Sequence, residues 1–287
     1  MTVGTLRYRV RPGGPWQVVL PGIYFAQTGA LQSAQRDVAA FLHAESAIAI
    51  TGVAALARQG IPCKRTEFVD VLVPLGCRRR DAGFVRLHTT AITPKVFIDG
   101  AVRYALPARA VADAARQLDD AAEVRALVAA SVQRGKAAIW QLSAELQNGP
   151  KRGSARLRQA LAEVADGVRS NAEGDLRALM KRAKLPAPMF NANLYVGDEF
   201  LASPDAWWRE LGVAAEVDSK EWHLSPEDWE RTLARHARMT AQGILVLHFP
   251  PSKIRAEGWL VIREIRSALN SARGPLAHIR TVAAGNR

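Results

Sequence analysis

The sequence predicts a chain of mixed α and β structure, an α/β protein of the α+β type that is divided into domains. Its 287 residues correspond to roughly two domains by length. Hydrophobic residues make up 48% of the chain, an ordinary share for a protein with packed cores. Apolar residues recur with helical spacing in some segments and with strand-like alternation in others. The order of these segments divides the chain into three regions, at residues 1–30, 31–165 and 166–287.

The first region, residues 1–30, predicts a basic helix followed by a β-hairpin. The segment LRYRVR has a helical pattern that stops at the Pro-Gly-Gly of residues 12–14. The segment PWQVVLPGIYFA predicts two short strands that turn at Pro21-Gly22. A helix and a hairpin in this order form the back half of a winged helix, a DNA-binding fold that needs two more helices in front. The chain is then truncated or mis-started at this end, or another segment completes the fold.

The middle region, residues 31–165, predicts an α+β domain. A helix over 34–44 is followed by a short strand and by a helix that starts near Ser46 or Thr51. The segments FVDVLVPLG and FVRLHTT predict two strands, and AVRYALPARAVADAARQL leads into another helix. Three more amphipathic helices follow, each ending at a glycine that is a usual helix C-cap: Gly135, Gly149 and Gly167.

The last region, residues 166–287, predicts the order α-β-β-β-α-β-α. A helix in SNAEGDLRALMKRA leads through the break LPAPMF into three strands, NANLYVG, EFLASPDAWW and GVAAEVDS. The helix SPEDWERTLARHARMTAQG, the strand ILVLHFP and the helix WLVIREIRSALNSA follow.

The net charge of the chain is +12, which indicates a polyanionic partner. Nucleic acid fits this excess best, and a membrane surface fits it less well. In the first region Arg7, Arg9 and Arg11 flank Tyr8, and Trp16 follows. A basic helix can place such arginines on the phosphates or base edges of double-stranded DNA. Two alternatives stay open. An arginine-rich genomic composition would explain the net charge without nucleic acid, and the front arginines could belong to a basic tail that does not bind DNA.

The cysteines and the apolar segments predict a cytoplasmic protein. Cys63 and Cys77 lack the spacing of zinc ligands, and two thiols in a chain of this size fit a reducing compartment. The N-terminus has no apolar signal segment. No apolar run approaches the ~18 residues that a membrane span needs, so no membrane partner is expected.

Three carboxylates come close together in the last region. Glu216 and Asp218 alternate along the strand AAEVDS and therefore share one face. Asp205 lies on the preceding strand, and a hairpin of this length can bring it beside Glu216. Converging carboxylates repel each other unless a divalent cation neutralises them, and oxygen ligands favour Mg²⁺ or Mn²⁺. The alternative is a solvated strand face on which Arg209 or Lys220 pairs with the acids.

This pattern resembles the PD-(D/E)XK nucleases, and in particular the branch related to very short patch repair endonucleases. Pro204-Asp205 and Glu216-x-Asp218 match the aspartate and the E-x-D of that branch, and GILVL matches its later strand. The resemblance covers residues 167–273 and implies a restriction-endonuclease-like α-β-β-β-α-β domain. It also implies hydrolysis of DNA phosphodiester bonds with Mg²⁺ or Mn²⁺, held by Asp205 and Glu216 with Asp218 as a third ligand or just behind them.

The same resemblance implies further site residues. Glu173 matches an acidic residue on the first helix of the branch, His223 matches its histidine, and Arg235 matches an arginine on the later helix that would contact DNA. The lysine that gives the superfamily its name is replaced by Asp218, and Lys220 is the nearest substitute. His223 or Lys220 is therefore the candidate general base, the histidine because its ordinary pKa lies near neutral.

Three of these residues also have structural interpretations. His223 can be a packed or capping residue beside a tryptophan, and Glu173 can be a solvated helix residue. Arg235 can form a surface ion pair with Glu227 or Glu230.

The front of the chain resembles a different family. The segment LRYRVRPGGPWQVVLPGIY is similar to the recognition-helix end and wing of AbiEi-type antitoxins, and ITGVAALARQGIP and ALPARAVADAAR are similar to the part that follows. The resemblance covers residues 4–135 and implies an antitoxin that represses its own promoter, with a cognate toxin encoded nearby. Arg109, Ala110 and Asp113 carry the middle motif, and we interpret Arg109 and Asp113 as a structural pair at a helix start.

Two functions therefore remain open. One is a DNA-binding endonuclease with a catalytic acidic site. The other is an AbiEi-like antitoxin and transcriptional repressor whose nuclease-like domain is catalytically silent. Double-stranded DNA is the partner in both.

Overall fold

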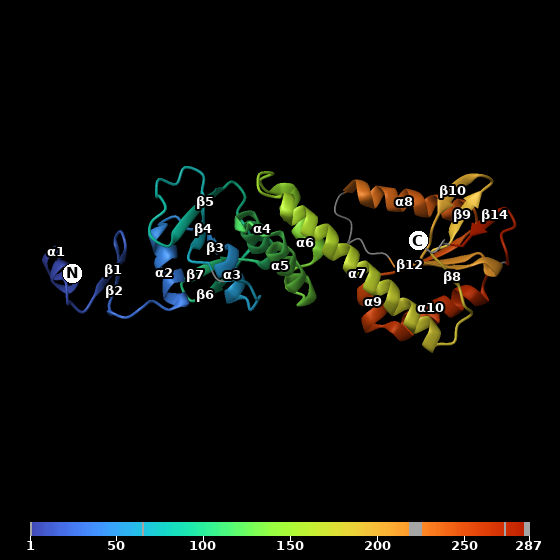
Figure 1. Cartoon of the computed structure of the whole chain (residues 1–287), viewed down its shortest axis with the longest axis horizontal. Helices are drawn as coiled ribbons and strands as arrows, with labels where there is room; N and C mark the ends of the chain where they lie inside the picture. The colour runs from blue at the N-terminus through green and yellow to red at the C-terminus, as the bar shows by residue number, and fades with distance from the viewer. Residues whose placement is uncertain (1, 65, 218–225, 273, 284–287) are drawn as a thin grey trace. The chain divides into compact units, whose positions relative to one another are not determined.

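The computed structural model contains helices and strands throughout, which confirms the mixed α and β fold class (Figure 1). The structure describes four ranges of residues: 2–64, 66–217, 226–272 and 274–283. The chain folds into two compact units, Met1–Leu161 and Ala162–Arg287. In the described ranges no helix has both the length and the apolar character that crossing a membrane requires.

The first unit begins with the helix and the hairpin that the sequence predicts. Helix α1 (Val3–Arg9) is followed by the antiparallel strands β1 (Gln17–Leu20) and β2 (Ile23–Phe25). Gly22, between the two strands, has a φ of 79°. That angle lies in the left-handed region, which glycine adopts without strain, so the predicted Pro-Gly turn is confirmed.

A five-stranded mixed sheet with the order β5-β4-β3-β7-β6 forms the centre of the first unit. Its strands are β3 (Ala49–Thr51), β4 (Val69–Pro74), β5 (Val85–Thr90), β6 (Val96–Asp99) and β7 (Val102–Ala105). Strand β3 pairs antiparallel with β4 and parallel with β7, and β4 pairs parallel with β5. The sequence predicted β3, β4 and β5. It did not predict β6 or β7, which pair antiparallel with each other, with β6 at the edge of the sheet.

Five helices complete the first unit: α2 (Ser33–His43), α3 (Gly52–Arg58), α4 (Pro107–Gln117), α5 (Ala121–Gln133) and α6 (Ile139–Asn148). Helices α2 and α3 contact the sheet, and α4 contacts α3, α5 and α6. Helix α5 ends within two residues of Gly135, and α6 ends directly before Gly149, as predicted. Helix α3 begins after Thr51, one of the two predicted starts.

Asp113 connects the central sheet to helix α4. Its Oδ2 accepts hydrogen bonds from Thr51 Oγ1 at 2.7 Å and Arg109 Nε at 2.8 Å, and its Oδ1 accepts one from Arg116 Nη1 at 3.0 Å. The side chain of Asp113 is 16% exposed and those of both arginines are 11% exposed. The expected arginine–aspartate pair is therefore present. Thr51 directs its hydroxyl to Asp113 and makes no side-chain cap at the start of α3.

We predict that Asp113→Ala lowers the free energy of unfolding by about 3 kcal/mol, because it leaves the largely buried charges of Arg109 and Arg116 without their carboxylate. Urea unfolding of the full chain, followed by circular dichroism, measures the change. Asp119→Ala is the matched control, since the Asp119 side chain is fully exposed. The control is expected to change stability by less than about 0.5 kcal/mol. Equal stability of the two variants would contradict the structural role of Asp113.

The described residues of the second unit form two small sheets. The four-stranded sheet has the order β13-β12-β11-β8, and the three-stranded sheet has the order β10-β9-β14. Their strands are β8 (Met189–Phe190), β9 (Asn193–Val196), β10 (Glu199–Ala202), β11 (Ala206–Trp208), β12 (Val213–Val217), β13 (Leu245–Phe249) and β14 (Ile279–Val282). The helices are the end of α7 (Ala155–Arg182), α8 (Pro226–Ala241), α9 (Pro251–Ala256) and α10 (Gly258–Asn270).

The predicted strand EFLASPDAWW is in fact two strands in different sheets, β10 and β11. The chain leaves regular β structure over residues 203–205, between these two strands. Pro204 has no N–H to donate to a strand ladder, which explains the break at this point. Asp205 consequently stands directly before β11, where the second strand begins.

Helix α7 continues through the point at which the sequence predicted a helix end. Gly167 and Gly174 both lie inside it, so the C-cap expected at Gly167 is wrong. A glycine in a helix interior costs only about 1 kcal/mol relative to alanine. Burial of Leu161 on one side of the glycines and of Leu176 on the other offsets that cost.

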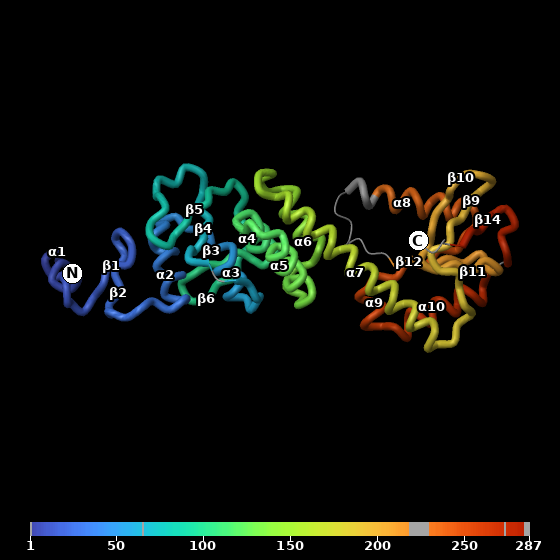
Figure 2. Tube along the Cα trace, in the orientation of Figure 1, coloured from blue at the N-terminus to red at the C-terminus, as the bar shows by residue number. Residues whose placement is uncertain are grey.

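Two apolar cores lie on opposite sides of strands β11 and β12. Successive residues of a strand point to opposite faces, so Trp208 joins the core that contains Phe249, while Trp207 joins the core that contains Met239. Figures 1 and 2 show α7, α9 and α10 on one side of these strands and α8 on the other. Trp208 Nε1 donates to the carbonyl of Pro186 at 2.7 Å, so its burial leaves the indole N–H paired.

Candidate catalytic and metal-binding centre

Asp205 and Glu216 lie side by side at the same end of strands β11 and β12. The strands pair antiparallel with Ala206 opposite Ala215, which brings the preceding residue of one strand next to the following residue of the other. Val217 N donates to Asp205 Oδ2 at 2.7 Å. Hairpin geometry thus produces the juxtaposition that the sequence predicted. The side chain of Glu216 is buried, and that of Asp205 is partly buried.

Burial perturbs both carboxyl groups. It raises the pKa of Asp205 above the ordinary value, and the Val217 N–H and the Arg169 guanidinium oppose the shift only in part. Burial also raises the pKa of Glu216, against the opposing charge of Arg235. The charge of Asp205 adds to the upward shift of Glu216, so the two acids interact.

Glu173 on helix α7 belongs to the same group of acids. Burial raises its pKa first, and the negative charge of Asp205 raises it further. Because such an effect falls off with distance, the interaction places Glu173 near Asp205. Arg169 Nε lies 3.7 Å from Glu173 Oε1, one helical turn away. The resemblance of the sequence pointed to Glu173, and its role in the acidic site stays a prediction.

Nitrogen groups of one arginine and two histidines lie around Glu216. Arg235 Nη2 lies 2.8 Å and His236 Nε2 lies 3.1 Å from Glu216 Oε2, both within hydrogen-bonding distance. His248 Nδ1 lies 3.9 Å from the same oxygen. The imidazole rings of His236 and His248 face each other, with centroids 3.7 Å apart. Glu216 is buried, so the open alternative of a solvated strand face is wrong for this residue.

The two histidines of this centre were not predicted from the sequence. His236 follows Arg235 on the amphipathic helix α8, and His248 interrupts the otherwise apolar strand β13. A histidine that interrupts an apolar run is an available signal, since the strand pattern alone does not explain it. Together with Glu216 they offer three ligand atoms within 4.8 Å of one another, so they can hold a metal ion.

Three of the predicted site residues lie outside the described residues: Asp218, Lys220 and His223. Arg235, predicted to contact DNA, donates to Glu216, whereas the ion-pair partners expected from the sequence were Glu227 and Glu230.

The predicted DNA-binding arginines at the front of the first unit are exposed: Arg7, Arg9 and Arg11. The guanidinium carbon of Arg9 lies 4.6 Å from the ring centroid of Trp16, and that of Arg11 lies 3.9 Å from the ring centroid of Tyr8. These cation–π contacts orient two of the three arginines while leaving their N–H groups at the surface.

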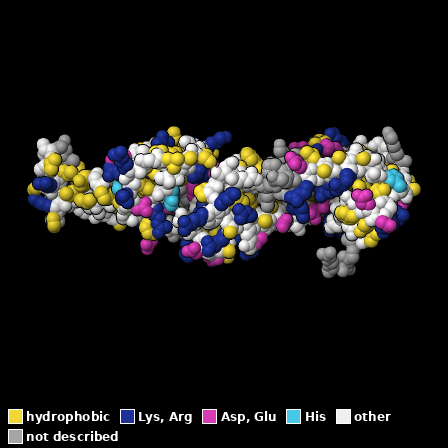
Figure 3. All heavy atoms as spheres, turned by 90° about the horizontal axis from the view of Figure 1, so that it is seen from above, with side chains coloured by type: hydrophobic (Ala, Val, Ile, Leu, Met, Phe, Trp, Pro, Cys, Tyr) yellow, Lys and Arg dark blue, Asp and Glu magenta, His cyan; other side chains and the backbone are white. Residues whose placement is uncertain are grey.

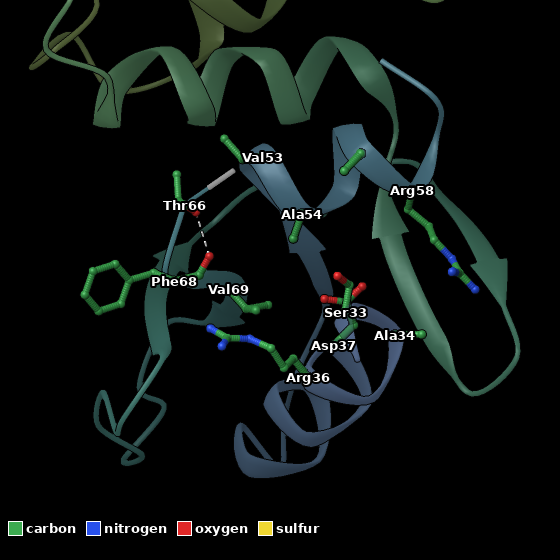
Figure 4. Close-up of a pocket in the computed structure, with 11 residues that line it drawn as sticks. Ser33, Ala34, Arg36, Asp37, Val53, Ala54, Arg58, Thr66, Phe68 and Val69 are labelled. Carbon is green, nitrogen blue, oxygen red and sulfur yellow. Dashed lines mark hydrogen bonds between the residues drawn. The ribbon is translucent and has the colours of Figure 1, made fainter. Parts of the chain in front are cut away.

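A cavity of about 210 Å³ opens in the first unit beside Asp37, where the sequence indicated no site (Figure 4). Tyr104 Oη donates to Asp37 Oδ2 at 3.0 Å, and burial raises the pKa of Asp37 to about 6. Arg36 and Arg58 also line the cavity, but Arg36 donates to a backbone carbonyl and Arg58 pairs with Asp99. Each of these polar side chains has its own hydrogen-bond partner, so the centre around Glu216 is the stronger candidate for chemistry.

The fold and the site define an α+β chain of two units, the second of which buries a centre of acids and histidines. The chain is similar over 275 residues to two uncharacterized proteins of Mycobacterium tuberculosis, from strains CDC 1551 / Oshkosh and ATCC 25618 / H37Rv. Each is 27% identical to it, and the match covers 95% of this chain and 99% of the relative. The similarity therefore extends over both units. No family model matches the chain.

We predict that Asp205→Asn raises the melting temperature at about pH 7 and that the gain shrinks toward about pH 4. The raised pKa of the folded state means that folding disfavours the ionised carboxylate. The penalty is present above the folded pKa and disappears below the unfolded pKa, so a neutral amide is favoured only at the higher pH. Asp198→Asn is the control, because the Asp198 side chain is fully exposed. Thermal unfolding at both pH values measures the effect. A lower melting temperature of Asp205→Asn than of the wild type at neutral pH would contradict the prediction.

Proposed function

We propose that the chain is a DNA-binding protein whose second unit is an endonuclease dependent on Mg²⁺ or Mn²⁺. The observation that carries this proposal is the convergence of Asp205, Glu216 and Glu173 on one partly buried centre, with burial raising the pKa of all three carboxyl groups. Such groups are costly to ionise together, and a divalent cation relieves that cost. Carboxylate oxygens are also the ligands that Mg²⁺ and Mn²⁺ prefer, so the residues fit the ion.

In this proposal Asp205 and Glu216 would hold the cation, which would supply an activated water and a counter-charge for the phosphate. The Val217 N–H fixes the orientation of Asp205, and Arg235 fixes that of Glu216. Arg169 stands beside Glu173 and provides a positive charge for the approaching DNA backbone. The hypothesis has two further parts. Asp218 would be a further ligand, and His223 or Lys220 would transfer the proton. A cytoplasmic location is part of it.

A second candidate is an antitoxin-like repressor with a silent nuclease fold, acting with a cognate toxin. One observation favours it: Arg235 and His236 contact Glu216 directly, so the protein can compensate this carboxylate without an ion. DNA binding through the exposed arginines of the first unit is shared by both proposals.

We predict that the full chain nicks supercoiled plasmid DNA with Mg²⁺ or Mn²⁺ and not with EDTA. Asp205→Ala is expected to reduce the rate by more than about 100-fold, since it removes a metal ligand rather than a residue behind one. Asp205→Asn keeps an acceptor for Val217 N and separates a loss of chemistry from a loss of folding. Asp198→Ala, at a fully exposed acid, should cut as the wild type does.

Undiminished cleavage by Asp205→Ala would contradict the assignment. Absence of cleavage on duplex, mismatched and single-stranded DNA would exclude the endonuclease and leave the antitoxin-like repressor as the proposed function.

We predict a steep salt dependence of DNA binding that depends on the front arginines. Figure 3 shows Lys and Arg side chains in several patches on the visible face. Replacing Arg7, Arg9 and Arg11 by alanine is expected to reduce the slope of log K against log salt by about three, one for each phosphate that an arginine no longer neutralises. The matched variant with three lysines keeps the charges and should keep most of the slope. Fluorescence anisotropy at several salt concentrations measures both. An unchanged slope in the alanine variant would exclude these arginines as phosphate-binding residues.

A further inference from the structure

Glu216, His236 and His248 come together from three different elements of the second unit. Strands β12 and β13 pair in parallel, and Glu216 stands directly opposite His248 in that pairing. Neighbouring residues of paired strands share one face of the sheet, so both side chains point to the same side. Helix α8 contacts β13 and supplies His236 from above that face.

The distances between these groups suit a metal ion with short bonds. His236 Nε2 lies 3.1 Å and His248 Nδ1 lies 3.9 Å from Glu216 Oε2. Metal–ligand bonds of about 2.1 Å in a tetrahedral site separate neighbouring ligand atoms by about 3.4 Å. The two measured separations bracket that value, and all three ligand atoms lie within 4.8 Å of one another. The two imidazole rings lie face to face, with centroids 3.7 Å apart, so they must also rotate apart before a nitrogen of each can point at one ion.

We propose that Glu216, His236 and His248 bind a divalent transition-metal ion through one carboxylate oxygen and two imidazole nitrogens. Imidazole nitrogen suits ions such as Zn²⁺, Co²⁺ and Ni²⁺, whereas Mg²⁺ prefers oxygen. Three protein ligands leave at least one coordination position open, as in catalytic rather than structural sites. The ion binds at the edge of the buried region, since Glu216 is 4% exposed at its side chain but His248 is 32% exposed.

Arg235 is compatible with the ion. A carboxylate has about four lone-pair positions on its two oxygens, so Glu216 can accept from Arg235 and bind a metal at the same time. His236 exchanges its contact with the carboxylate for a bond to the ion. Arg235 then acts as a positioning residue that orients Glu216, the usual role of a group behind a metal ligand.

This site goes beyond the proposed nuclease function, because binding by the histidines can be measured whether or not the chain cuts DNA. It shares Glu216 with the acidic group but does not use Asp205. A variant at Asp205 and a variant at His248 therefore separate the two proposals.

The test is calorimetric titration of the full chain, purified without a polyhistidine tag, with Zn²⁺ and separately with Mg²⁺. We expect one Zn²⁺ per chain, and His236→Ala or His248→Ala should weaken binding by at least about 100-fold. His278→Ala is the matched control, because His278 is an exposed histidine of the same unit. Asp205→Asn should weaken Zn²⁺ binding much less than either histidine variant does, because Asp205 affects Glu216 only through its charge. Unchanged Zn²⁺ affinity in both histidine variants, or no Zn²⁺ binding by the wild type, overturns the proposal.

A second measurement covers the case in which the histidine variants do not fold. Co²⁺ bound to the wild type should give the intense visible absorption of a low-coordinate nitrogen-containing site. A weak spectrum typical of six oxygen ligands would overturn the proposal. Mg²⁺-dependent cleavage that survives in His248→Ala while Zn²⁺ affinity is unchanged would contradict this site and leave the nuclease proposal standing.

Discussion

The buried carboxylate of Glu216 is the constraint on which the second unit depends. A carboxylate that is 3% exposed has lost most of its hydration, so hydrogen bonds and positive charge must replace it. Arg235 and His236 on α8 provide this compensation, and His248 on the neighbouring strand lies close by. Polar contacts therefore hold α8 over the sheet, in addition to the apolar burial of Met239 beneath it. The contacts that compensate the charge of Glu216 are therefore also contacts that hold α8 on the sheet.

This arrangement connects the two functional proposals. A glutamate that is compensated by an arginine and a histidine is tolerated by the fold without an ion, as a DNA-binding regulator would require. An ion that binds only the folded chain shifts the equilibrium toward the ion-bound state by mass action, against the positive charge of Arg235. The choice between the two states then depends on the concentration of free metal as much as on the residues.

Much of the fold and part of the centre could be predicted from the sequence, for local reasons. The turn at Gly22 and the juxtaposition of Asp205 with Glu216 follow from short-range rules of hairpin geometry. His248 was missed because its partner acid lies on a strand that is distant in sequence and adjacent only through parallel pairing. Helix α7 overrode the stop predicted at Gly167, because tertiary packing outweighs one unfavourable helix residue.

The alternation of Trp207 and Trp208 across β11 limits how the sequence of this chain can vary. A shift of one residue in the pairing with β12 would exchange the two faces and carry Asp205 away from its neighbour. The short connection over residues 209–212, which ends at Gly212 with a φ of 63°, sets that register. Selection should therefore act on the length of this connection more strongly than on most of its side chains. A distant relative that preserves the spacing preserves the centre, even where its surface has diverged.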